Sequence, residues 1–127
     1  MVSKARFEKI ALSFETAEMH VGNSMAVVKV FGKFFTRLRP EDDTIVITVG
    51  SRDERDMLLE LDPETFTLTD HYRSGPWILA RRTKIDAKRL KAMLEKRWQK
   101  MAPKKLLRER AAMPAANPKQ RKTSKKT

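Results

Sequence analysis

The chain has 127 residues, which is enough for one domain with an appendage but not for two domains. It contains no cysteine, which excludes disulfides, cysteine-based zinc sites and thiol catalysis. The net charge of +12 is unevenly distributed: residues 96–127 hold twelve basic residues and one acidic residue, whereas residues 1–95 hold 16 basic and 15 acidic residues. A polyanionic partner is therefore indicated for the C-terminal part rather than for the body.

The N-terminal residues favour a helix. Apolar residues recur at i, i+3, i+4 and i+7 from Phe7, and Ser3 is a suitable N-cap. We expect this helix to end between residues 14 and 17, before a turn at Gly22 and Asn23.

The next segments favour strands. Residues 25–30 and 33–39 are rich in β-branched and aromatic residues and flank Phe31 and Gly32, so they predict a hairpin. A turn follows at Pro40, and residues 44–49 (TIVITV) predict a third strand.

The second half of the chain alternates between helix and strand patterns. Ser51 and Glu54 have the S-x-x-E spacing of a capping box, and Asp62-Pro63 ends the helix that they begin. We expect Met57, Leu58 and Leu61 of this helix to face the core. The remaining elements that we expect are a short strand in 64–68, a strand over 77–84, a helix from the cap Asp86 to Pro103, and one or two helical turns in 106–112.

This order predicts an α+β fold, an antiparallel sheet with helices packed on one face and the other face open to solvent or a partner. We expect a domain over residues 1–107 and a basic, disordered tail over residues 108–127. From Met113 onward the sequence has no aromatic and no β-branched aliphatic residue, so it cannot bury enough apolar surface to offset its ordering entropy.

We expect no enzyme activity, no metal and no cofactor. His20 and His71 lack metal-ligand spacing, and Gly32-Lys33 lacks the earlier glycine and the following helix of a phosphate-binding loop. The carboxylates cluster in turns and in a helix's first turn, where they solvate or cap. No targeting segment or spanning helix is evident, so we expect a cytoplasmic protein. We further expect a bacterial-type protein, with a monomer favoured.

The basic residues are better organised. If Phe34 and Leu38 face the helices, the strand period of two puts Lys33, Arg37 and Arg39 on the open face, with Lys29 beside them. Arg81 and Arg82 are adjacent, so one of them should be exposed, near Lys84. Further candidates for phosphate contact lie in the C-terminal part, namely Lys104, Lys105, Lys119, Arg121, Lys122, Lys125 and Lys126.

Each of these features also has a purely structural interpretation. Charged side chains on an exposed strand face also provide solubility and protect the edge. Trp77 either stacks on a base or anchors the core at the start of its strand. Trp98 lies on the apolar stripe of the last helix and is expected in the core.

Three motifs resemble one known family. The stretch Val28-Lys-Val-Phe-Gly-Lys-Phe-Phe-Thr-Arg-Leu38 resembles the "F-x-V-x-G-K-x-F-A-x-L" hairpin of the MmcQ/YjbR family. Phe66 followed by Gly75-Pro-Trp-Ile78 resembles its second signature, and Trp98 followed by Ala102-Pro-Lys-Lys-Leu106 resembles its helical end. The resemblance covers about residues 1–107. It implies a CyaY-like fold and a DNA-binding role through a "double wing" of β-hairpins.

We therefore expect a DNA-binding protein without strong sequence preference. The open sheet face and the hairpins would contact phosphates, and the C-terminal arm would add mobile positive charge. The alternative is a protein-interaction or small-ligand module with a solubilising tail.

Overall fold

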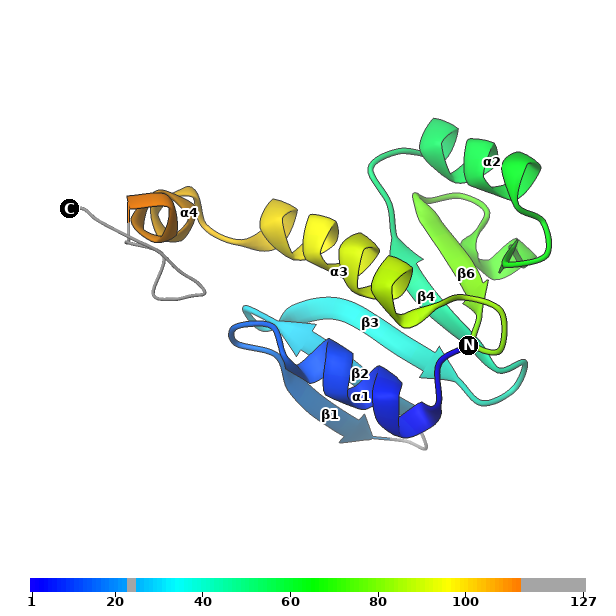
Figure 1. The fold of residues 1–127 in the computed structure, drawn as a ribbon, viewed down its shortest axis with the longest axis horizontal. Coiled ribbons are helices and arrows are strands. Elements are labelled where there is room, and N and C mark those ends of the chain that lie inside the picture. The colour runs from blue at the N-terminus through cyan, green and yellow to red at the C-terminus, as the bar shows by residue number, and fades with distance from the viewer. Residues whose placement is uncertain (23–24, 113–127) are drawn as a thin grey trace.

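The computed structural model describes residues 1–22 and 25–112. In this part of the chain a six-stranded sheet packs with four α-helices (Figure 1). The strand order is β1-β2-β3-β4-β6-β5, and each neighbouring pair is antiparallel. The predicted α+β class is confirmed.

The elements follow one another in the order that the figure colours trace from blue to orange. Their bounds are α1 Lys4–Leu12, β1 Glu18–Gly22, β2 Met25–Val30, β3 Lys33–Arg39, β4 Thr44–Thr48, α2 Arg52–Leu61, β5 Phe66–Thr67, the short 3-10 helix η1 Asp70–Tyr72, β6 Trp77–Arg81, α3 Ala87–Met101 and α4 Lys104–Ala112.

The predicted helix starts are confirmed by their caps. The side chains of Ser3, Ser51 and Asp86 each accept a hydrogen bond from the backbone N–H three residues later, at 3.0, 3.1 and 2.7 Å. The capping box at α2 differs from the standard form in one detail. The Glu54 side chain accepts a hydrogen bond from the backbone N–H of Gly50, at 3.3 Å, and not from that of the N-cap residue Ser51.

One strand is absent from the sequence-based prediction. β1 pairs with β2 over its whole length, from Glu18 opposite Lys29 to Gly22 opposite Met25. It is an edge strand whose residues are all exposed except the half-buried Met19. Because no buried row alternates along it, the period-two pattern that identifies a strand is missing.

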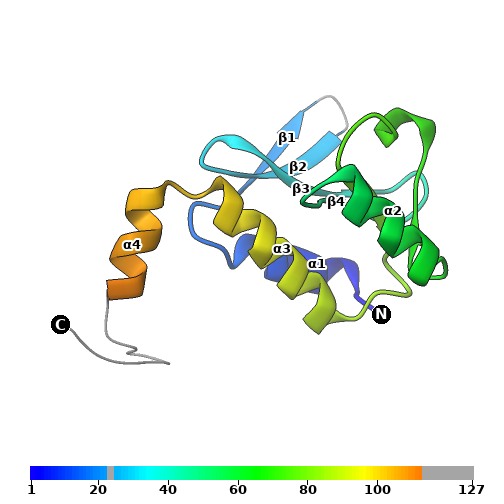
Figure 2. The same ribbon diagram turned by 90° about the horizontal axis from the view of Figure 1, so that it is seen from above.

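The hydrophobic core lies between the sheet and two helices. Figure 2 shows α1 and α3 side by side on one side of the sheet. The core between these helices and the sheet includes Phe7, Phe35, Ile47, Leu94 and Trp98. The expected helix-covered face is therefore confirmed.

The second helix packs differently from its predicted pattern. α2 contacts β5 and β6 and adds Leu58 and Leu59 to the core. Met57 and Leu61, which the helical period also favours as buried, are 51% and 73% exposed. Since α2 packs mainly at one end of the sheet, against β5 and β6, its buried stripe is narrower than the pattern predicts.

A β-bulge in β3 reverses the predicted facing of two aromatic residues. Val28 pairs with Thr36 and Lys29 pairs with Phe34, so Phe35 has no partner of its own. Phe35 is fully buried in the core, and Phe34 lies with Lys29 on the helix-free face. The uninterrupted period of two is therefore wrong for this pair.

Candidate nucleic-acid interface

Three of the predicted cations share the helix-free face. Arg37 pairs with Val46 in β4. The strand neighbours of Val46 point into the core, so Val46 and Arg37 face the other, helix-free side of the sheet, as does Arg39 two residues later. Lys29 lies on the same face. Lys33 does not, because it pairs with Val30, whose side chain is in the core, so it lies on the helix-bearing side.

The two arginines on this face are ion-paired by the turn that follows their strand. Arg37 Nη2 lies 3.4 Å from Glu41 Oε1, and Arg39 Nη2 lies 3.2 Å from Asp42 Oδ2. Their side chains are only 11% and 12% exposed. Arg37 and Arg39 thus lie on the predicted face, but the turn acids largely offset their charge, which favours the alternative interpretation of this face.

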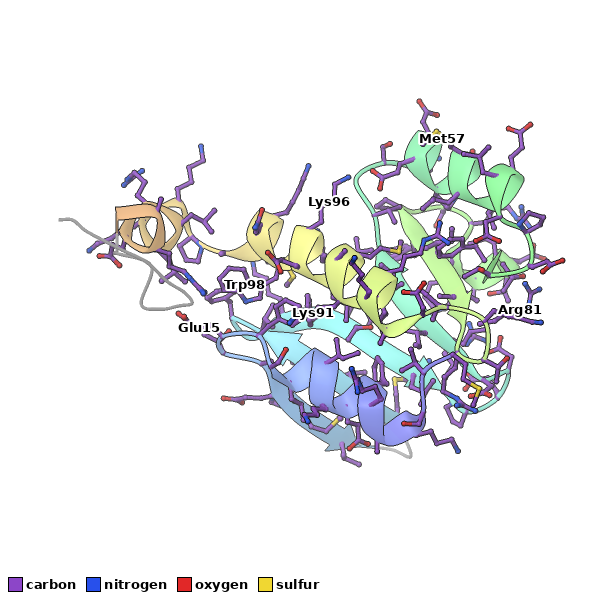
Figure 3. The ribbon with its side chains drawn as sticks, in the orientation of Figure 1. Glu15, Met57, Arg81, Lys91, Lys96 and Trp98 are labelled. Atoms are coloured by element: carbon purple, nitrogen blue, oxygen red, sulfur yellow. The ribbon has the colours of Figure 1, made fainter. Side chains whose placement is uncertain are left out.

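The prediction that Arg81 or Arg82 is exposed is also wrong. The Nε and Nη2 atoms of Arg82 donate hydrogen bonds to the two carboxylate oxygens of Asp43, at 2.7 and 2.8 Å. Arg81 donates to backbone carbonyls of the segment 63–66, the nearest at 2.8 Å (Figure 3 labels it at the end of the sheet). Both arginines are half-buried, whereas Lys84 nearby is exposed.

The hydrogen bonds of Arg81 and Arg82 hold neighbouring loops in place, and they leave little free positive charge for a ligand. The hydrogen bond from Arg82 holds the pKa of Asp43 below its usual value, and the same bond raises the pKa of Arg82. The pKa of Asp62 is likewise lowered, chiefly by the hydrogen bond from Arg89 of α3. Arginines committed in this way would lose an existing partner on binding a phosphate.

Positive charge is concentrated instead on the two C-terminal helices. α3 and α4 together hold ten basic and two acidic residues, whereas the other described residues hold 13 basic and 14 acidic residues. We name the exposed cations at the C-terminal end of this helical pair the C-terminal basic surface, which comprises Lys96, Lys100, Lys104, Lys105 and Arg108.

Helical spacing gathers these side chains. Lys96 and Lys100 are four residues apart on α3, and Figure 3 shows Lys96 projecting away from the sheet. The three cations of α4 lie opposite its half-buried Leu106 and Leu107. Lys96 lies 3.5 Å from Glu54 but stays 63% exposed, and the other four members form no ion pair within the described part of the chain. Burial lowers the pKa of the half-buried Arg97, which is not part of this surface.

Contacts with the body hold α4 in place. Arg110 lies 3.3 Å from Glu15 and its guanidinium stacks 5.1 Å from the ring of Trp98. Trp98 in turn donates to the backbone oxygen of Glu15 at 3.0 Å, and both residues are labelled in Figure 3. The predicted domain boundary at residue 107 falls inside α4. The tail cations Lys119, Arg121, Lys122, Lys125 and Lys126 lie outside the described residues.

An aromatic groove on the helix-free face was not anticipated as a site. It has a volume of about 740 Å³, and its walls include Phe34, Tyr72 and Trp77 as well as Arg37 and Arg39. Trp77 is therefore half-buried in a groove rather than in the main core. The adjacent Phe34-Phe35 pair was the available signal, since two neighbouring strand residues cannot both face one core without a bulge.

The same face is less open than predicted. Val46 and Leu79 point to it by the strand register, yet both are fully buried. The side chains around the groove therefore form a second, smaller apolar layer on this side of the sheet.

The described residues contain neither a metal-ligand cluster nor a membrane-spanning helix. Within 1–22 and 25–112 no three His, Asp or Glu residues gather as metal ligands would. His20 lies beside Glu18 at 3.4 Å, and His71 packs edge-on against Tyr72. Over the same ranges, none of the helices combines the length and the apolar character that a bilayer span requires.

Comparison with known proteins gives one match. The family model described as YjbR matches residues 11–100. No curated protein and no solved structure matches the chain. The matched range contains the whole sheet and nearly all of α3, and α4 lies beyond it.

Proposed function

We propose that this chain, which belongs to the YjbR family, binds DNA without strong sequence preference through its C-terminal basic surface. The observation that carries the proposal is the separation of charge within the fold. The five cations of that surface are exposed, and four of them have no carboxylate partner in the described part of the chain. The arginines of the sheet face are already paired.

Unpaired surface cations suit phosphate contact energetically. An exposed Lys or Arg gives up only water when it meets a phosphate, and each contact releases counterions from the DNA. Arg39 or Arg82 would first have to leave a carboxylate. Binding through the sheet face, which the strand pattern predicts, is accordingly less well supported than binding through the helices.

The chemistry of the surface implies little sequence preference. Contacts from Lys and Arg to phosphate oxygens position a protein on the duplex without reading base edges. Residues 113–127 add five more Lys and Arg to the sequence beyond α4, which would extend the contact along the backbone.

Fluorescence anisotropy with a labelled 20-base-pair duplex tests the proposal. Five phosphate contacts predict a slope of log K against log salt of about −4.5, and the residues after α4 would steepen it. Absence of binding at low salt would reject the proposal.

The groove on the helix-free face supports a second candidate, a small-ligand or protein-interaction module. In that case the C-terminal cations keep the protein soluble, and duplex binding should be absent at low salt while a ligand still occupies the groove. The salt titration therefore separates the two candidates.

A further inference from the structure

The groove on the helix-free face is shaped by three neighbouring strands. Phe34 comes from β3 and Trp77 from β6, and β4 lies between them. Because neighbouring strands are about 4.8 Å apart, the two outer strands are separated by about 10 Å. The register places both rings towards the same end of the groove, beyond the aligned residues Arg37 and Leu79.

The two rings are held but remain accessible. Trp77 packs edge-on against Tyr72, with ring centroids 6.0 Å apart, and Gly75 leaves room for its indole because it has no Cβ. Phe34 has no aromatic neighbour among the described residues. Both side chains are half-buried, so part of each ring faces the groove.

Two arginines lie beside the rings. The Nε atoms of Arg37 and Arg39 are buried and form no hydrogen bond in the described part of the chain, although Arg39 Nε lies 3.6 Å from Glu41 Oε2 in their ion pair. The guanidinium of Arg39 lies 5.3 Å above the ring of Tyr72, which fixes its plane. Glu41 and Asp42 nearly offset the charge of the two arginines, and Glu41 itself lines the groove, so an anionic ligand group would bind these arginines by displacing Glu41.

We propose that this groove binds the unstacked bases of single-stranded nucleic acid, with a base on Phe34 and Trp77 and a backbone phosphate taking the place of Glu41 beside Arg37 or Arg39. Rings interleaved with arginines provide stacking for any base and a contact to its phosphate. A duplex keeps its bases inside its own stack. The inference rests on the proposed function only in taking nucleic acid as the partner, and it places single strands at a site separate from the C-terminal basic surface.

Two-dimensional ¹⁵N–¹H NMR with the hexanucleotide (dT)6 tests the inference. The chain has two tryptophans, so the indole N–H of Trp77 reports the groove and that of Trp98 serves as an internal control on the helix-bearing side. Trp77→Phe assigns the two signals. We expect (dT)6 to shift the Trp77 signal and to leave the Trp98 signal in place.

Two variants separate stacking from general loss of structure. Phe34→Leu keeps an apolar side chain but removes the ring, and should weaken (dT)6 binding at least about fivefold. Met57→Leu changes an exposed apolar residue of α2 outside the groove and should bind as the wild type does. Because the groove arginines are largely neutralised, the salt slope for (dT)6 should be shallow, near the value of about −0.7 for one phosphate.

Several results would overturn the inference. These are an unmoved Trp77 signal at saturating (dT)6, wild-type affinity in Phe34→Leu, or thymidine 5′-monophosphate binding as tightly as (dT)6, which would identify a small-ligand site. The substitutions Lys104→Gln, Lys105→Gln and Arg108→Gln should leave the Trp77 shift intact. Loss of duplex binding alone would then contradict only the proposed function, and loss of the Trp77 shift alone would contradict only this inference.

Discussion

Removing three cations from α4 should change the salt dependence of duplex binding by a calculable amount. Lys104, Lys105 and Arg108 are exposed, and none forms an ion pair within the described residues, so each is available to one phosphate. At about 0.9 per contact, replacing all three with Gln should make the slope of log K against log salt less steep by about 2.7. Gln has a similar helix propensity, so α4 should be retained.

The effect on affinity follows from the same slope. Raising salt from 50 to 200 mM weakens each phosphate contact by about 3.5-fold, so three contacts account for about 40-fold. The wild type should therefore lose about 40 times more affinity than the triple variant over this range. Anisotropy titrations of one labelled duplex at four or five salt concentrations measure both slopes.

A matched control lies on α1. Lys4, Arg6 and Lys9 are exposed and form no ion pair in the described part of the chain, so replacing them with Gln removes the same formal charge from another surface. This variant should keep a slope close to that of the wild type. Equal slopes in the two triple variants would refute the reasoning, because the binding would then depend on total charge rather than on the C-terminal basic surface.

Three further predictions concern stability. The pKa of Asp43 is lowered in the folded state by Arg82, so their pair stabilises the fold above about pH 4 and this contribution is lost as pH falls through the lowered pKa. Unfolding midpoints of Asp43→Asn should therefore lie below those of the wild type at pH 6 and converge with them towards pH 2, and parallel curves would contradict the role of this pair. Arg55→Met removes a buried guanidinium nitrogen that donates to two loop carbonyls at 2.7 and 2.8 Å, so urea denaturation should show a loss of about 2–4 kcal/mol, whereas a loss below about 0.5 kcal/mol would rule out this anchor. Gly32 has φ of 75° and open space around its missing Cβ, so Gly32→Ala should cost about 1 kcal/mol from backbone strain alone, and an unchanged stability would show that the turn relaxes.

Much of the fold follows from local chemistry and was predictable. The caps at Ser3, Ser51 and Asp86 and the apolar stripe of α3 depend on residues within one or two helical turns of each other. The hairpin at Phe31-Gly32 forms with positive φ at both positions, which the glycine favours. The family signature spans these same elements.

The errors arise where tertiary contacts override the period. β1 is an edge strand with almost nothing buried, so its residues carry no alternating pattern. The bulge at Phe35 reverses the facing of Phe34 and Lys33 because one extra residue shifts the register.

Charge was the hardest feature to predict at the site. The residues Glu41 and Asp42 were predicted as a solvated turn, and their distance from Arg37 and Arg39 depends on how that turn folds back on the strand. The pair of Asp43 with Arg82 joins positions 39 residues apart, for which no sequence period exists. Composition located the excess of cations in the C-terminal part, but only the fold distinguishes paired from unpaired ones.

The central claim is that duplex DNA meets this chain at the C-terminal helices and not at the sheet-face arginines. Backbone amide shifts in a ¹⁵N–¹H titration with a 20-base-pair duplex at low salt measure this directly. We predict the largest shifts within residues 96–108, with small ones at Arg37 and Arg39. Shifts concentrated in β2, β3 and β6, with residues 96–108 unmoved, would contradict the claim.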